Sequence, residues 1–202
     1  MPFADEVRPV DIVPYRTTWA SEFDALGGRL WTALNPVALA IDHIGSTAVP
    51  RLPAKDVIDV QVLVANLDRV MLVKRFERIG FRQRREPWNV VETSFGARCE
   101  KLVFAPPVGE RACNVHVRVE DQPNARFALL FRDFLRADTA VRDAWGEFKS
   151  RLAAEVPDLA HYGQIKAPAT EILMQAASTW AAGDSTSELL PRSASPESVG
   201  GA

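Results

Sequence analysis

Cysteine is scarce in this chain of 202 residues, which holds only Cys99 and Cys113. The two do not form a CxxC pattern, and no pair of histidines stands near them at metal-ligand spacing. A structural zinc site and a disulfide framework are therefore both disfavoured. Because so little cysteine fits a reducing compartment, we expect a cytoplasmic protein.

Long apolar runs and a dominant charge are also lacking. No run approaches the roughly 18–20 residues of a membrane helix, and the opening MPFADEVRPV has no signal-peptide pattern. The formal net charge is −2, which gives no overall attraction to nucleic acid or to an anionic membrane. We expect neither of these partners, whereas a protein partner stays open.

What the chain does have is the composition of a globular protein. Hydrophobic residues make up 47% and charged residues 25%, which is enough for a core. The length suits one large domain, or one domain with a tail. The last stretch is rich in Gly, Ser and Pro, so we predict a domain over 1–182 and a disordered tail over 183–202.

The order of predicted elements is a helix, a mostly β middle and a helical C-terminal third, which is an α+β arrangement. We expect Val70 and Ile172 to face the core from their helices, and 86–99 to form a loop or a hairpin. The periodicity predicts helices over 18–34, 67–79, 124–137, from 138 or 139 to Pro157, and over 168–181, with strands over 10–13, 37–43, 57–64, 81–85, 101–105 and 113–120.

The clearest signal is the stretch 42–64, DHIGSTAVPRLPAKDVIDVQVLV. Two β-branched apolar runs flank a Gly/Ser/Thr/Pro loop, which indicates strand, loop, strand. Glycine lets the backbone approach a ligand, and the groups of Gly45, Ser46 and Thr47 can hold phosphate oxygens. A plain turn is the alternative, but Asp59, with twelve residues between it and Ser46, favours a site.

Asp59 is the candidate catalytic residue and metal ligand. A carboxylate in an apolar strand is costly unless it is paired or binds a cation, so we expect Asp59 to hold Mg²⁺. The alternative is a buried carboxylate satisfied by backbone donors or by Lys55. Gln61 shares its strand face but is a weaker ligand, and a two-metal site needs carboxylates. Glu120, at the end of NVHVRVE, is the second catalytic candidate that could supply the missing charge.

Lys55 and His116 are candidate phosphate contacts. A lysine can place a point charge on a phosphate, although a solvated loop lysine beside Asp56 is an equal alternative. His116 alternates with Asn114 and Arg118 along one strand face, which favours a polar face turned toward the site. A structural role is at least as good an explanation for this histidine.

The pattern HIGSTAVPxLxAKxxIDVQV resembles the signature of the GrpB family. The segment FRDFLRA (131–137) and the regions of Lys149 and Lys166 extend this resemblance over roughly residues 9–181. The resemblance implies the nucleotidyltransferase superfamily, with a mixed β-sheet flanked by helices and a core pattern of Gly-Ser, a spacer and Asp-x-Asp/Glu on a strand. It also implies a domain that occurs as an appendix on some dephospho-coenzyme A kinases.

Four basic residues of the C-terminal third are further nucleotide-binding candidates. Arg132 and Arg136 lie four apart, on one side of a helix, and the planar guanidinium suits phosphate. The resemblance adds Lys149 and Lys166. The alternative for all four is a solvated charged face.

Two functions follow from these residues. The first is a nucleotidyltransferase that binds a nucleoside triphosphate with Mg²⁺ and transfers a nucleotidyl group to an unknown acceptor, with charge on the α-phosphate stabilised by metal and basic groups. The second is a non-catalytic module that binds a nucleotide or coenzyme A and assists or regulates a partner enzyme. Gln61, at the position of a second carboxylate, favours the second function.

Overall fold

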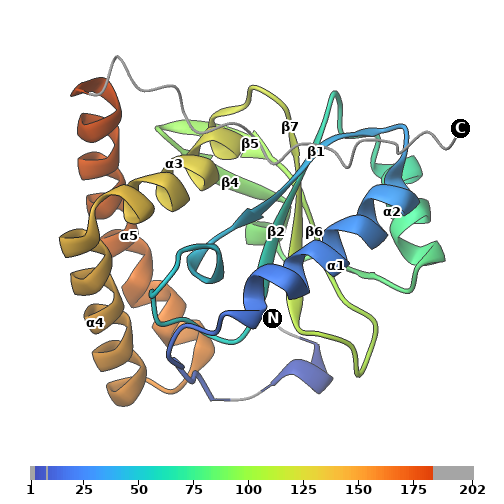
Figure 1. The fold of residues 1–202 in the computed structure, drawn as a ribbon. Coiled ribbons are helices and arrows are strands. Elements are labelled where there is room, and N and C mark those ends of the chain that lie inside the picture. Colours follow the sequence, from blue (N-terminus) through green and yellow to red (C-terminus); the bar gives the residue numbers. More distant parts are fainter. Residues whose placement is uncertain (1–2, 8, 184–202) are drawn as a thin grey trace, which may run out of the picture.

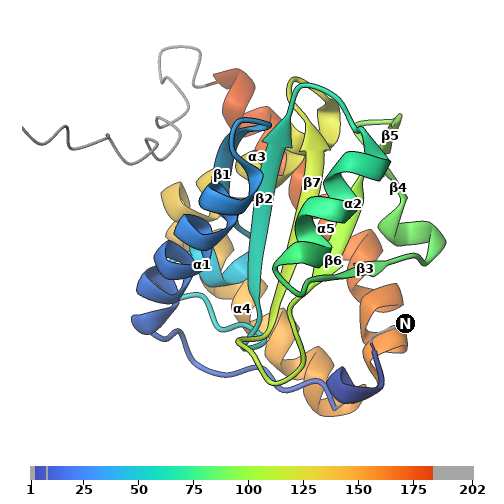
Figure 2. The same ribbon diagram turned by 90° about the vertical axis from the view of Figure 1, so that its right-hand side faces the viewer.

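The structure is a computed structural model that describes residues 3–7 and 9–183. A five-stranded mixed sheet lies at its centre, with helices on both faces (Figures 1 and 2). Strands β2 and β7 run parallel, and the other neighbouring pairs are antiparallel. In spatial order the strands are β1 (Ala38–Ile44), β2 (Ile58–Val64), β7 (Cys113–Val119), β6 (Leu102–Ala105) and β3 (Arg82–Arg84).

The remaining elements surround this sheet. Strands β4 (Val91–Ser94) and β5 (Ala97–Glu100) form a separate hairpin. The helices are α1 (Thr18–Leu34), α2 (Arg69–Arg78), α3 (Pro123–Ala137), α4 (Thr139–Glu155) and α5 (Leu159–Gly183), with short 3₁₀-helices η1 (Ala4–Glu6), η2 (Ser46–Ala48) and η3 (Pro87–Asn89). The predicted α+β class, a mixed sheet flanked by helices with a helical C-terminal third, is confirmed.

One face of the sheet is apolar and carries α1 and α2 (Figure 2). The apolar stripe of α1 supplies Trp19, Leu30 and Leu34, all fully buried. On α2, Phe76 stacks on Phe104 of β6 with ring centroids 3.8 Å apart. The valines of β2 and β7 at alternate positions complete this core, because side chains of a strand alternate between faces.

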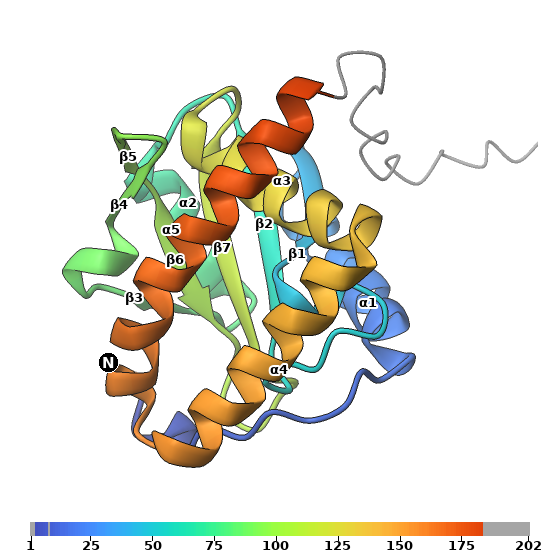
Figure 3. The same cartoon turned by 90° about the vertical axis from the view of Figure 1, so that its left-hand side faces the viewer.

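The opposite face of the central strands is polar and is covered by α3, α4 and α5 (Figure 3). The parallel register places Asp59 beside Asn114, and Gln61 beside His116. Sequence alternation predicted that these residues share a face, and the register confirms it. The fold therefore brings the polar residues of two strands under the C-terminal helices.

Two residues predicted to face the core, and one predicted helix boundary, are wrong. Val70 and Ile172 are 67% and 74% exposed, whereas their neighbours Leu72 and Leu173 are buried. An apolar residue beside the buried stripe of a helix fits the helical period almost as well as a residue within that stripe. The sequence alone therefore did not distinguish exposed from buried apolar residues here. Helix α5 begins at Leu159, and Pro168 lies inside it.

Two further predictions concern the ends of the chain. The predicted strand over 10–13 is a single bridge between Val13 and Ala54. Residues 184–202 of the predicted tail lie outside the described residues, and α5 extends through Gly183. Within 3–7 and 9–183, no helix is both long and apolar enough to cross a membrane.

Candidate functional site

The site begins at the turn between β1 and η2, where the backbone touches a carboxylate. Gly45 has a φ of +70°, and a Cβ atom on it would lie 2.6 Å from Oδ2 of Asp59. Real Cβ atoms do not approach other atoms that closely, and L side chains rarely adopt this φ. Glycine is therefore required at this position, because Asp59 packs against Gly45.

Asp59 lies near the start of β2 with its carboxylate held from one side. Asn114 Nδ2 donates to Asp59 Oδ1 at 3.0 Å, and His116 Nε2 lies 3.9 Å from the same oxygen. Burial acts to raise the pKa of Asp59, but His116, Asn114 and the charge of Lys55 outweigh it and leave that pKa below its usual range. Asp59 is therefore ionised at neutral pH.

His116 is neutral beside this carboxylate. Burial lowers the pKa of His116 to about 4, and the nearby charges of Arg118 and Lys101 act in the same direction. Its Nδ1 atom is buried and makes no hydrogen bond within the described part of the chain. The separation of 3.9 Å from Asp59 is too long for a hydrogen bond, so His116 is a neighbour of the carboxylate rather than its ion-pair partner at neutral pH.

Two lysines reach the same place from the C-terminal helices, the buried Lys149 and the half-buried Lys166. Lys149 of α4 is 3% exposed, and its Nζ donates to Ser46 Oγ at 3.0 Å and to the Pro53 carbonyl oxygen at 2.5 Å. Burial, together with the charges of Lys166 and Lys55, lowers the pKa of Lys149 to about 7. Burial and the charge of Lys55 also lower the pKa of Lys166 on α5.

Lys55 connects these lysines to the loop before β2. Its Nζ lies 5.9 Å from the ring centroid of Tyr162 on α5. The charge of Asp59 acts against the lowering of the pKa of both Lys149 and Lys166. Three ammonium groups from separate parts of the chain thus converge near one carboxylate, which we call the lysine cluster (Lys55, Lys149 and Lys166).

The two predicted arginines of α3 hold the backbone of the turn. Arg132 bonds Asp133 through two nitrogens and donates from Nη1 to the His43 carbonyl oxygen at 3.2 Å. Arg136 donates twice to the Ala48 carbonyl oxygen, at 3.0 and 2.7 Å. The structure therefore places both guanidinium groups on the chain flanking Gly45 rather than beside the lysine cluster.

Thr47 also supports the turn. Its Oγ1 lies 3.0 Å from His43 Nε2, and both side chains are buried. The ring of His43 stacks on Phe23 with centroids 4.6 Å apart. Of the predicted Gly-Ser-Thr trio, Ser46 is the member whose side chain meets the lysine cluster, and the hydroxyl of Thr47 is engaged with His43.

The structure does not bring Glu120 to Asp59. Asp59 pairs with Asn114 at the start of β7, whereas Glu120 follows the end of that strand and its N–H bonds to the Val64 carbonyl oxygen. At about 3.3 Å per residue, the six steps from Asn114 to Glu120 span about 20 Å. Alternation predicts which face of a strand a side chain occupies but not its distance along the strand, so this separation could not be predicted from the sequence.

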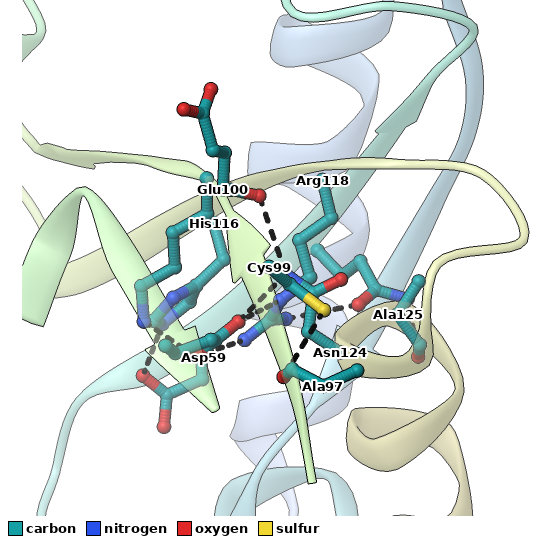
Figure 4. A network of polar contacts seen from close by, with 11 residues as sticks. Asp59, Ala97, Cys99, Glu100, His116, Arg118, Asn124 and Ala125 are labelled. Carbon is teal, nitrogen blue, oxygen red and sulfur yellow. Dashed lines mark hydrogen bonds and ion pairs between the residues drawn. The ribbon is translucent and has the colours of Figure 1, made fainter. Parts of the chain in front are cut away.

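A second polar cluster was missed by sequence reasoning, and Figure 4 shows two of its members, Arg118 and Asn124, near Asp59 and His116. Gln61 is fully buried, accepts from Arg118 Nη1 at 2.9 Å and donates to the Ala125 carbonyl oxygen at 3.4 Å. Arg118 and Lys101 donate to the two carboxylate oxygens of Glu92, at 2.8 and 2.5 Å. We call Gln61, Glu92, Lys101, Arg118 and Asn124, which also bonds Glu92, the Glu92 network.

Glu92 is ionised within this network. Burial acts to raise its pKa, but the charges and hydrogen bonds of Arg118 and Lys101 outweigh it and bring that pKa to about 2. Glu92 comes from the hairpin β4–β5, in the stretch 86–99 where the sequence shows no clear period. The charges at Lys101 and Arg118, next to apolar strand residues, indicate that these side chains need partners, but they do not identify Glu92 as the partner.

The donor set does not fit a two-metal Mg²⁺ site. Asp59 is a single carboxylate, and Gln61 Oε1 already accepts from a guanidinium. The lysine cluster adds positive charge beside Asp59. In the part of the chain that the structure describes, no group of three or more His, Cys, Asp or Glu residues could hold a metal ion. Two dications need several carboxylates to offset their charge.

Comparison with known proteins finds relatives over most of the chain. The family model described as GrpB protein matches residues 9–176. A dephospho-CoA kinase of Mycobacterium tuberculosis is 34% identical over 191 residues, covering 86% of this chain and 47% of that protein. UPF0157 protein BH1888 of Halalkalibacterium halodurans is 31% identical over 180 residues, covering 85% of this chain and 86% of that protein. The chain thus spans about half the length of the dephospho-CoA kinases that it matches.

Solved structures agree as well. The crystal structure of conserved protein GrpB from Enterococcus faecalis superposes with a TM-score of 0.69 at 28% identity, covering 84% of this chain and 99% of that one. Cid1 in complex with its short product ApU reaches a TM-score of 0.47 at 14% identity, covering 68% of this chain and 42% of that one. The family match covers most of the chain, and the Enterococcus structure shares its fold. This chain belongs to the GrpB family.

Proposed function

We propose that this protein binds the phosphate groups of a nucleotide or coenzyme A-type ligand at the lysine cluster, without a metal ion, and serves as a binding module beside a partner enzyme. The observation that carries the proposal is the convergence of Lys55, Lys149 and Lys166 next to Ser46 and Asp59. Like charges brought together under cover of helices are unfavourable unless an anion joins them.

The protonation of Lys149 explains how a phosphate would be held. With a pKa of about 7, this ammonium is charged in about half of the molecules at neutral pH. A bound phosphate favours the charged form, so binding takes up a proton. Ser46 Oγ accepts from Lys149, and a hydroxyl that accepts a bond can still donate its own hydrogen to a phosphate oxygen.

The ligand class rests on two further observations. Arg118 bonds Gln61, which stands where the resemblance implies a second carboxylate, so cationic side chains rather than Mg²⁺ balance the phosphate charge in this proposal. Relatives named dephospho-CoA kinase match this chain over about half their length, which supports a ligand of the nucleotide and coenzyme A class and a role next to a partner enzyme.

Thermal unfolding with a ligand panel tests the proposal. ATP, GTP, coenzyme A and inorganic triphosphate would each be added with Mg²⁺ and with EDTA. A ligand at about 100 times its Kd that binds only the folded state adds about 2.7 kcal/mol. We expect this stabilisation in EDTA, its loss in Lys166→Gln, and its retention in Arg151→Gln, which removes a guanidinium 79% exposed on α4. No stabilisation by any of these ligands would overturn the proposal.

A second candidate is nucleotidyl transfer with Mg²⁺, and one observation favours it. Asp59 is kept ionised and in contact with the Gly45 backbone, as a catalytic carboxylate needs to be. Transfer of label from an α-³²P nucleoside triphosphate to any acceptor in a cell extract would be measured with and without Mg²⁺. Metal-dependent transfer that disappears in Asp59→Asn would favour this candidate over the binding module. Binding in EDTA without transfer would exclude it.

A further inference from the structure

A cavity of about 290 Å³ lies at the edge of the sheet where β2 and β7 begin. Its wall combines the N-terminal segment, the residues before β2, the start of β7 and the first residue of α5. Two wall residues, Lys55 and Asn114, also belong to the phosphate site, since Lys55 is part of the lysine cluster and Asn114 bonds Asp59. The cavity therefore adjoins that site.

The N-terminal segment is fixed against the rest of the fold and closes one side of this cavity. The Val10 N–H donates to the Pro157 carbonyl oxygen at 2.9 Å. Val13 and Ala54 exchange two backbone hydrogen bonds, at 2.9 and 3.0 Å. Val10 also packs with Tyr162 of α5. The wall is thus a pre-formed part of the structure, as ligand sites commonly are.

The wall offers apolar surface together with polar groups. Val13, Val57 and Leu159 are apolar members, each only partly buried. Arg84 belongs to the wall as well, and its Nε is buried without a hydrogen-bond partner in the described chain, while its other nitrogens pair with Glu6. A buried donor without a partner costs free energy that a ligand acceptor would recover.

We infer that this cavity holds the base of a nucleoside phosphate whose phosphate groups lie on the lysine cluster. The inference rests on the proposed function and narrows its ligand class. A base needs apolar surface against its faces and hydrogen-bonding groups at its edge, which Val57, Leu159, Arg84 and Asn114 supply. At about 290 Å³ the cavity is at the lower limit of ligand sites, so it suits a base with its ribose.

Binding of ATP and of inorganic triphosphate, both in EDTA, would be compared by calorimetry. Leu159→Trp and Val57→Phe each place a larger side chain in the wall. Ile165→Trp is the matched control, because Ile165 is 47% exposed on the same helix as Leu159 and is not a wall residue. Circular dichroism and the unfolding midpoint would establish that each variant is folded.

We expect both filling variants to weaken ATP binding at least about tenfold by excluding the base, and to leave triphosphate within about twofold. Ile165→Trp should bind both probes as the natural protein does, and Lys166→Gln should bind neither.

Unchanged ATP binding in the filling variants, or equal affinity of the natural protein for the two probes, would overturn the inference without affecting the proposed phosphate site. Equal weakening of both probes by both variants would also overturn it. If the natural protein bound neither ATP nor triphosphate, the proposed function would be overturned instead.

Discussion

Two polar clusters lie on the same face of the sheet and differ in how their charges are matched. In the Glu92 network, both cations bond directly to a carboxylate, since Arg118 and Lys101 each donate to Glu92. In the lysine cluster, Lys149 donates to two uncharged oxygens, those of Ser46 and Pro53. Each cluster combines buried side chains with half-buried ones, such as Lys149 beside Lys166 and Arg118 beside Glu92, so burial alone does not explain the contrast.

The difference separates a cluster that ties elements together from one that we propose binds a phosphate group. The Glu92 network joins the hairpin β4–β5 to β2, β7 and α3 through hydrogen bonds of Glu92, Gln61, Arg118 and Asn124. In the lysine cluster, burial and then the charges of neighbouring lysines lower the pKa values of Lys149 and Lys166. Selection for stability alone would not gather these lysines, because an anion is needed to offset them.

Glu92→Gln should have the largest effect, because it removes the charge that both cations of the network share. Leaving Arg118 and Lys101 buried without their carboxylate should lower the free energy of unfolding by about 3–5 kcal/mol. Urea denaturation would measure this loss in the free energy of unfolding. Glu147→Gln is the control, since its carboxylate is 62% exposed and pairs only with an exposed arginine, and it should change stability by less than about 0.5 kcal/mol. A small loss for Glu92→Gln would mean that the network contributes little to stability.

Lys149→Met should change the pH dependence of stability. The pKa of Lys149 is about 7 in the fold, and unfolding returns it toward about 10.4. Between these values the unfolded chain binds more protons, so stability of the natural protein rises with pH, by up to about 1.4 kcal/mol per unit. Below pH 7 the contribution of Lys149 to the free energy of unfolding no longer changes with pH.

The comparison for Lys149→Met is made by urea denaturation from pH 6 to 10. The natural protein should gain stability relative to the variant as the pH rises above 7. Lys74→Met, which removes an exposed lysine of α2, is the matched control. Parallel curves for the natural protein and Lys149→Met would show that Lys149 keeps an ordinary pKa and would weaken the case for a phosphate site.

The sequence predicted one cluster far better than the other, for a physical reason. Gly45, Ser46 and Asp59 lie within one strand–loop–strand unit, where spacing and strand period fix their neighbourhood. Lys149 and Lys166 were found only through family resemblance, because their meeting with Ser46 depends on how α4 and α5 pack.

The same limit explains what sequence reasoning missed. Glu92 comes from a hairpin of short strands with no clear period, so its contacts with Arg118 and Lys101 could not be foreseen. Glu120 was expected beside Asp59 because alternation places both on one polar face. The register of β2 against β7 decides the separation along the strands, and a single sequence does not contain that register.

Gly45→Ala should have a smaller effect on stability than Glu92→Gln, but one directed at the phosphate site. The left-handed φ alone costs a non-glycine residue about 1–2 kcal/mol, and the new Cβ would stand 2.6 Å from Asp59 Oδ2. The carboxylate of Asp59 must move, so we expect a lower unfolding midpoint together with weaker triphosphate binding. Gly28→Ala in α1 is the control, because a Cβ there meets nothing within 4 Å and should stabilise the helix by about 0.5–1 kcal/mol. If Gly45→Ala lost stability yet bound triphosphate as the natural protein does, the position of Asp59 would be unimportant to the lysine cluster, and the two halves of the site would act separately.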